Sequence, residues 1–166
     1  MTVLTVTKQT FRASMSPVWA VAVLCSTAFG AVANESPPAG DVRIEMPWAR
    51  ASIGTGRPVA AFVTVINDGN RADRLVKIDT PVAAKAEVHE TTTEDGVSRM
   101  NRIERLTIDP KNRVEFQPGS LHIMLFDLHM PIKDGETFPL DMYFERAGRV
   151  SVTVPVAGPG ASGPPP

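Results

Sequence analysis

The alternation of apolar and polar residues with a period of two constrains the fold of this sequence most. Val42, Ile44 and Met46 alternate with charged residues, and the segment 59–67 (VAAFVTVIN) is apolar enough for a strand covered on both faces. Side chains two residues apart share one face of a β-strand, whereas a helical face repeats every three to four residues. No stretch of about twelve residues between 41 and 156 has helical periodicity, so we expect an all-β domain.

Further short segments have the same pattern and are separated by turn residues. Turns are expected at residues 67–70 (NDGN), 94–96 (EDG) and 117–120 (QPGS), and additional strands at residues 75–78, 86–89, 113–116, 121–128, 137–144 and 149–156. About eight or nine short strands at this spacing predict a Greek-key β-sandwich or a small β-barrel.

The first 33 residues differ from this domain and have the order of a secretory signal peptide. Lys8 and Arg12 are followed by an apolar stretch that begins at Val18 and ends in the small-x-small site Ala31-Val32-Ala33. This stretch of about 16 residues is short of the ~20 that a transmembrane helix needs. We therefore expect cleavage after Ala33 and a mature chain that begins at Asn34 without a membrane anchor.

Removal of this segment also removes Cys25, the single cysteine of the chain. The mature chain then has no thiol for a disulfide or a zinc site. A lipoprotein signal needs a small residue before the cysteine, and here Leu24 precedes it. We expect an exported protein of a bacterial periplasm, with a linker at residues 34–40, one β domain at residues 41–156 and a disordered tail rich in Pro and Gly at residues 157–166.

Histidine and methionine side chains stand together on the expected strand 121–128. His122, Met124 and Phe126 point to one face of this strand, while the leucine and isoleucine residues between them point to the core. Met46, Met142 and Trp48 are expected in the core, although Trp48 could also form a wall beside a site. His129 and Met130 point to opposite faces of a strand and are expected to be surface and packing residues.

His89 and Met100 flank the predicted turn at residues 94–96. If the loop centres on Glu94 and Asp95, His89 and Met100 are direct cross-strand partners. If Asp95 and Gly96 form a two-residue loop, His89 faces Arg102 and Met100 is a diagonal neighbour on the same face. In both cases the imidazole and the thioether point together.

Folding this hairpin onto the strand 121–128 would bring two imidazoles and two thioethers together. Thioether sulfur is a soft ligand that favours Cu(I), and imidazole also suits copper, whereas zinc prefers thiolate, imidazole or carboxylate. Uncharged ligands leave the charge of Cu(I) uncompensated, so we expect a site near the surface that passes its ion to a partner.

The spacing His89-x10-Met100-x21-His122-x-Met124 is the signature of the periplasmic copper chaperones called PCu(A)C, and the sequence resembles that family. The resemblance covers nearly all of residues 41–156 and includes the stretches 48–51, 60–67, 121–125 and 135–140. It implies a cupredoxin-like β-barrel or sandwich and one Cu(I) ion. It also implies delivery of copper by a monomer to the Cu(A) centre of cytochrome c oxidase subunit two, or to other periplasmic copper proteins.

The chain departs from some members of this family at two places. Glu90 follows the first histidine where some members have a methionine, and the C-terminal tail has none of the His and Met residues found in some extensions. We therefore expect no second copper site in the tail.

Other classes of protein fit the sequence less well. A blue-copper electron carrier needs a cysteine ligand, and a net charge of −1 disfavours nucleic acid as a partner. There is no G-x-S-x-G motif, and His89-Glu90 lacks the second histidine of H-E-x-x-H, so we do not expect an enzyme. The alternative is a periplasmic β-sandwich module for ligand binding or adhesion, in which the His and Met residues are incidental.

Overall fold

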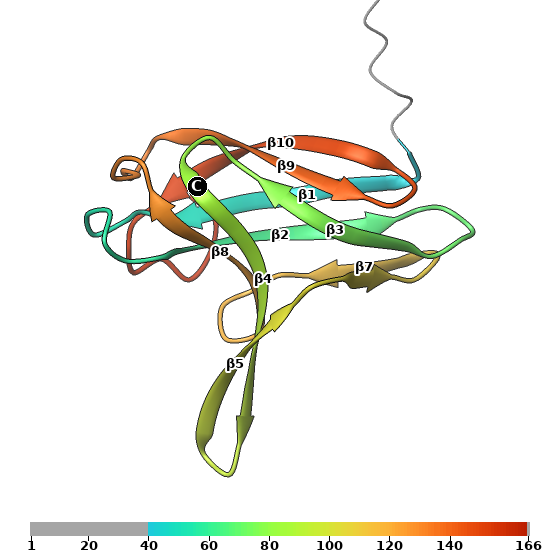
Figure 1. Cartoon of the computed structure of the whole chain (residues 1–166), viewed down its shortest axis with the longest axis horizontal. Helices are drawn as coiled ribbons and strands as arrows, with labels where there is room; N and C mark the ends of the chain where they lie inside the picture. The colour runs from blue at the N-terminus through green and yellow to red at the C-terminus, as the bar shows by residue number, and fades with distance from the viewer. Residues whose placement is uncertain (1–39, 166) are drawn as a thin grey trace, which may run out of the picture. The chain divides into compact units, whose positions relative to one another are not determined.

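A computed structural model describes residues 40–165 of the chain (Figure 1). The predicted signal peptide and nearly all of the predicted linker lie outside these residues. The described part has no helix, and the all-β prediction is confirmed. It contains ten strands: β1 (Val42–Arg50), β2 (Val59–Asn67), β3 (Asp73–Asp79), β4 (Ala83–Glu94), β5 (Val97–Ile103), β6 (Leu106–Ile108), β7 (Asn112–Glu115), β8 (Leu121–Leu128), β9 (Thr137–Phe144) and β10 (Gly148–Ala157). No helix in this part is therefore long and apolar enough to cross a lipid bilayer.

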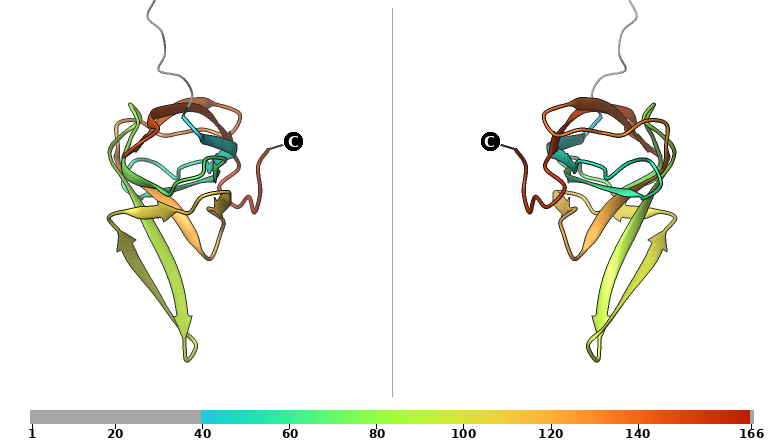
Figure 2. Two further views of the ribbon diagram at one scale, coloured as in Figure 1. Left: turned by 90° about the vertical axis from the view of Figure 1, so that its right-hand side faces the viewer. Right: turned by 90° about the vertical axis from the view of Figure 1, so that its left-hand side faces the viewer.

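The strands form two layers that face each other (Figure 2). One layer has the order β5-β4-β8-β2-β1, with β7 next to β8 along the same side of β2, and the other has the order β10-β9-β3-β6. A short parallel pairing of β1 with β10, at Ala49↔Val156 and Arg50↔Ala157, joins the layers. Within the described residues, no pairing connects the outer strands β5 and β6. The structure is therefore the sandwich, not the closed barrel, of the two predicted alternatives.

The core lies between the layers and is formed by alternate residues of each strand. Ala61, Val63 and Val65 of β2 and Ile123 and Leu125 of β8 are fully or almost fully buried. Residues of the other layer with the same burial are Leu140, Met142, Val154 and Val156, so the prediction of a core position for Met142 is confirmed. Burial of a large aliphatic side chain contributes about 1.5–3 kcal/mol. This packing fixes which face of β2, β4 and β8 points away from the core.

The prediction that Met46 belongs to the core is wrong. The pairing of β1 with β2 shifts register between Glu45 and Trp48, and Met46 has a φ of 46° and an exposed fraction of 59%. A bulge of this kind interrupts the alternation that the sequence pattern assumes. After the bulge, Trp48 is buried and stacks on Phe62, with ring centroids 4.4 Å apart.

The C-terminal residues pass along the end of β1. The backbone N–H of Ala51 donates to the carbonyl of Ala157 at 2.7 Å, and Arg50 Nε donates to the carbonyl of Ala161 at 2.8 Å. The disorder predicted for this tail stays a prediction, and the structure describes its residues through Pro165. One hydrogen bond from the β1 side chain of Arg50 and one from the backbone of Ala51 connect it to the end of β1.

Candidate metal centre

The β4–β5 hairpin positions His89 and Met100. Asp95 and Gly96 have φ values of 51° and 75°, which are the positive angles that a two-residue type I′ turn requires. The strands therefore pair Thr91 with Met100 and His89 with Arg102. This is the second of the two registers that the sequence allowed, in which Met100 is a diagonal neighbour of His89.

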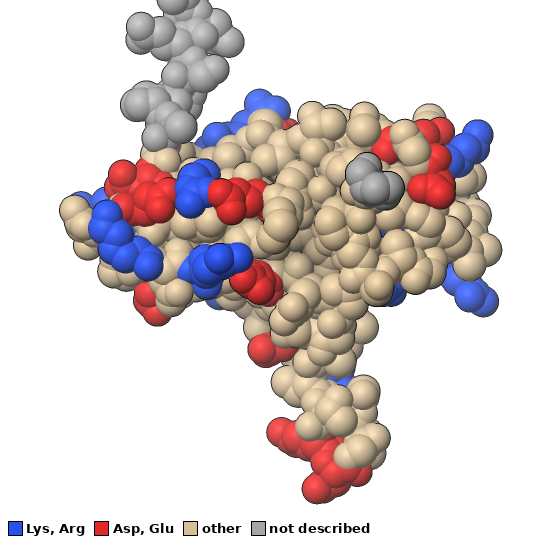
Figure 3. Space-filling view, turned by 180° about the vertical axis from the view of Figure 1, so that it is seen from behind, with Lys and Arg blue, Asp and Glu red and all other residues tan. Residues whose placement is uncertain are grey.

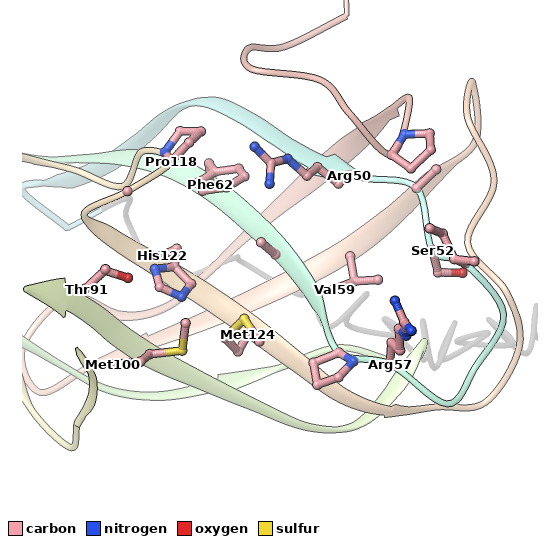
Figure 4. Close-up of a pocket in the computed structure, with 16 residues that line it drawn as sticks. Arg50, Ser52, Arg57, Val59, Phe62, Thr91, Met100, Pro118, His122 and Met124 are labelled. Carbon is pink, nitrogen blue, oxygen red and sulfur yellow. The ribbon is translucent and has the colours of Figure 1, made fainter. Parts of the chain in front are cut away.

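Strand β8 lies on the other side of β4 and completes the cluster. His89 pairs directly with His122, and their ring centroids are 6.2 Å apart, while Met124 pairs with Glu87. Because side chains two residues apart share a face, the four predicted residues stand on one face of β5, β4 and β8. Figure 4 shows Met100, His122 and Met124 pointing toward one another.

Among the described residues, each imidazole leaves one ring nitrogen without a hydrogen-bond partner. His122 Nδ1 lies 2.8 Å from the carbonyl oxygen of Ser120, and a carbonyl only accepts, so Nδ1 carries the proton and Nε2 keeps its lone pair. His89 Nε2 lies 3.3 Å from the Glu87 carboxylate, while Nδ1 is buried and has no partner among the described residues. A buried nitrogen left unpaired is uncommon, and both free lone pairs fit a metal ligand.

Glu87 is a charged residue of this cluster that sequence analysis missed. Its side chain is only 9% exposed, and its Oε1 lies 2.9 Å from Arg102 Nε and 3.2 Å from Lys85 Nζ. Burial opposes ionisation of Glu87, but hydrogen bonds to His89 and Lys85 and the charge of Arg102 outweigh it and lower the pKa of the carboxyl group. The spacing of two residues between Glu87 and His89 was the available signal, since it puts both on one face.

The cluster is buried on one side and open on the other. A hollow of about 430 Å³ borders Met100, His122 and Met124 but not His89, whose ring lies 5.7 Å from that of Phe126. Met100 is 54% exposed and His122 only 6%. A bound ion would therefore be reached from the side of Met100.

The histidine and methionine that follow β8 do not join this cluster. Within residues 40–165, no group of three or more His, Cys, Asp or Glu side chains could hold a metal ion, so a set of four ligands here would include the two thioethers. His129 and Met130 are exposed and follow Leu128, which pairs with Ala83 at the other end of the β4–β8 ladder.

Comparison with known proteins agrees with this fold. Residues 42–156 match the family model described as putative lipoprotein LpqE-like. The chain is 32% identical over 125 residues to the uncharacterized protein RP573 of Rickettsia prowazekii, a match that covers 73% of this chain and 69% of that protein.

Two solved structures are similar over the same region. The copper-bound PCuAC domain from PmoF2 is 26% identical, with a TM-score of 0.63, and the match covers 73% of this chain and 96% of that domain. The solution structure of CuI-DR1885 from Deinococcus radiodurans is 27% identical, with a TM-score of 0.55, and the match covers 72% of this chain and 78% of that chain. The chain belongs to the LpqE-like family, and its β domain is of the PCuAC type that the sequence resemblance implied.

Proposed function

We propose that the protein is a periplasmic metallochaperone that binds one Cu(I) ion through His89, Met100, His122 and Met124. The observation that carries this proposal is the gathering of two imidazoles and two thioethers from three strands on one face. The donor set is suited to Cu(I). The copper-bound PmoF2 domain and the Cu(I) form of DR1885 support the same ion for this chain.

Copper is the cargo of this protein, and it moves by ligand exchange. Met100 stands on the outer strand β5 and is the most exposed of the four residues, so an incoming ligand replaces its sulfur first. His122 is almost fully buried and releases the ion last. No substrate bond is made or broken in this sequence, and we propose no enzymatic activity.

The proposed cargo route begins with export and ends at another copper protein. We infer that the chain is cleaved after Ala33, acts in the periplasm as a monomer and passes copper to the Cu(A) site of cytochrome c oxidase subunit two. The word lipoprotein in the description of the matching family supports export. Mass spectrometry of the periplasmic fraction should find an N-terminus at Asn34, and a chain that begins at Met1 in the membrane pellet would contradict this route.

Competition with a chromophoric Cu(I) chelator tests the site. We expect one Cu(I) per mature protein and a loss of affinity of at least about tenfold, or ~1.4 kcal/mol, in Met124→Ala. Met130→Ala is the matched control, because Met130 is 63% exposed and outside the cluster. If Met124→Ala competes as well as the wild type, the ligand assignment is wrong. A wild type that takes up no Cu(I) favours the metal-free ligand-binding or adhesion module.

A further inference from the structure

The hollow beside the candidate ligands is the space from which an acceptor must approach. Met100, His122 and Met124 form one wall, and the loop after β1, with Ser52 and Arg57, forms the opposite wall (Figure 4). Ligand exchange needs a donor atom of the acceptor beside the ion while the first ligands still hold it. A segment of the acceptor therefore has to enter this hollow.

The wall of the hollow carries positive charge that no carboxylate balances. Arg50 and Arg57 line it, no Asp or Glu does, and neither arginine forms an ion pair within residues 40–165. Arg50 is held in place because its guanidinium lies 5.8 Å from the centre of the Phe62 ring and donates to the carbonyl of Ala161. Arg57 is exposed. Figure 4 shows the Arg50 guanidinium beside the Phe62 ring and the Arg57 side chain near Ser52 and Val59.

Two guanidinium groups beside a cation site oppose the binding of the ion by simple repulsion. Their placement is favourable once an anionic group occupies the hollow, because each then gains a charge-assisted hydrogen bond. The rim also includes Ile53, which is 71% exposed and available for apolar contact. The hollow thus suits a peptide segment that carries carboxylates and some apolar surface.

We infer that this hollow docks an acidic segment of the copper acceptor. Carboxylates of that segment pair with Arg50 and Arg57 while its own metal ligands reach the ion at Met100. The inference rests on the proposed function, since it names the chemistry of the partner that the copper site serves. Charge complementarity of this kind acts mainly on the rate of association and weakens as salt increases.

Copper transfer and complex formation test this inference in separate arms. In the first, the Cu(I)-loaded mature protein is mixed with the apo soluble domain of oxidase subunit two, and the transfer rate is measured at low and high salt. We expect Arg57→Glu to slow transfer about tenfold at low salt and the difference to disappear near 1 M salt, where the Debye length is about 3 Å. Arg71→Ala is the control, because Arg71 is also exposed and forms no ion pair within residues 40–165.

In the second arm, the apo protein labelled with ¹⁵N is titrated with the same apo domain. We expect amide shifts around residues 50–62 and 118–124, and their loss in Arg57→Glu. Equal transfer rates for Arg57→Glu and the wild type, shifts confined to β3 and β9, or no shifts at low salt would each overturn the inference. Failure of the proposed function is distinguishable, because it appears as a wild type that takes up no Cu(I), whereas docking is measured here without copper.

Discussion

At the scale of single residues, the largely buried carboxylate of Glu87 supplies the negative charge that the four uncharged candidate ligands lack. It accepts a hydrogen bond from His89 Nε2 and so leaves Nδ1 as the nitrogen with a free lone pair. It also brings one negative charge into contact with the His89 ring, on the same face as the candidate ligands. Loss of a carboxylate that orients a metal-binding histidine in this way typically lowers metal affinity by about 10–100-fold.

We expect Glu87→Ala to lower Cu(I) affinity by about tenfold or more, because His89 loses the partner that fixes its tautomer. Glu90→Ala is the matched control, since Glu90 directly follows His89 in the chain but points to the opposite face of β4. Chelator competition measures the affinity, and long-range ¹H–¹⁵N NMR of the apo protein reports the His89 tautomer. A Glu87→Ala protein with unchanged affinity and an unchanged tautomer would show that Glu87 has only a structural role.

The sequence predicted the four candidate ligands but not Glu87, and the reason is physical. The imidazoles and thioethers form a recognisable chemical set with a family spacing, whereas acidic residues are common on exposed strands. Glu87 is distinguished by its contact with Arg102, which comes from the partner strand β5. Such a contact depends on the register of the hairpin, and the sequence left that register open.

At the scale of elements, the turn of the β4–β5 hairpin decides where Met100 lies. Asp95 and Gly96 both have positive φ, which glycine adopts freely and aspartate tolerates. This turn selects the pairing of Thr91 with Met100 over the direct pairing of His89 with Met100. The period-two pattern predicted strands on both sides of the turn, but it could not predict the bulge at Met46, since a bulge adds a residue without changing composition.

Gly96→Ala should therefore affect both stability and copper binding. A side chain at a φ of +75° is strained, and we expect the free energy of unfolding to fall by about 1 kcal/mol. If the strain shifts the hairpin register, Met100 leaves its place and Cu(I) affinity falls as well. Denaturant unfolding measures the first effect, and NMR contacts between Thr91 and Met100 report the second.

Gly160→Ala is the control for this substitution. Gly160 does not have a φ between +20° and +160°, and a Cβ added there would meet no other part of the described chain within 4 Å. Equal unfolding free energies for the two glycine variants would contradict the strain expected at Gly96, and unchanged contacts between Thr91 and Met100 in Gly96→Ala would show that this glycine does not determine the hairpin register.

At the scale of the whole molecule, the cluster and the hydrophobic core lie on opposite faces of the layer that contains β4 and β8. His89 and His122 stand on the outer face of β4 and β8, while Ile123 and Leu125 of the same strand β8 are fully buried toward the other layer. The sequence predicted both faces of β8 correctly. It could not establish which strands are neighbours, because the pairing of β4 with β8 joins residues more than thirty positions apart, so the folding of the hairpin onto the strand 121–128 stood as a condition of the predicted cluster.

Charged side chains are distributed unevenly over the surface of the molecule. In the view of Figure 3, acidic and basic side chains gather toward the two ends of the sandwich, and acidic residues cover the tip of the projecting β4–β5 hairpin. Glu94 and Asp95 at the hairpin tip are both exposed. The hairpin is held by the pairing of β4 with β8 and not by burial of its tip. The position of Met100 therefore depends on the pairing of β4 with β5 and on the turn between them.

Stability and copper binding should be separable, because the layer of β3 and β9 contributes no candidate ligand. Asp73 is 4% exposed, and its carboxylate accepts hydrogen bonds from the backbone N–H groups of Arg74, Arg146 and Ala147 at 2.7–3.0 Å. These bonds fasten the β9–β10 turn to the start of β3. Asp73→Ala leaves buried donors unpaired, and we expect it to lower the free energy of unfolding by about 2–3 kcal/mol.

The same variant should keep its Cu(I) affinity within about twofold of the wild type at temperatures where it remains folded, because distant sites with no shared partners are independent. Asp73→Asn retains a carbonyl acceptor and should lose less stability than Asp73→Ala. Thermal unfolding of the apo proteins and chelator competition on the folded ones check the two expectations. A fall in Cu(I) affinity that follows the loss of stability across both variants would mean that the two layers act as one unit, and that the ligand face depends on the packing behind it.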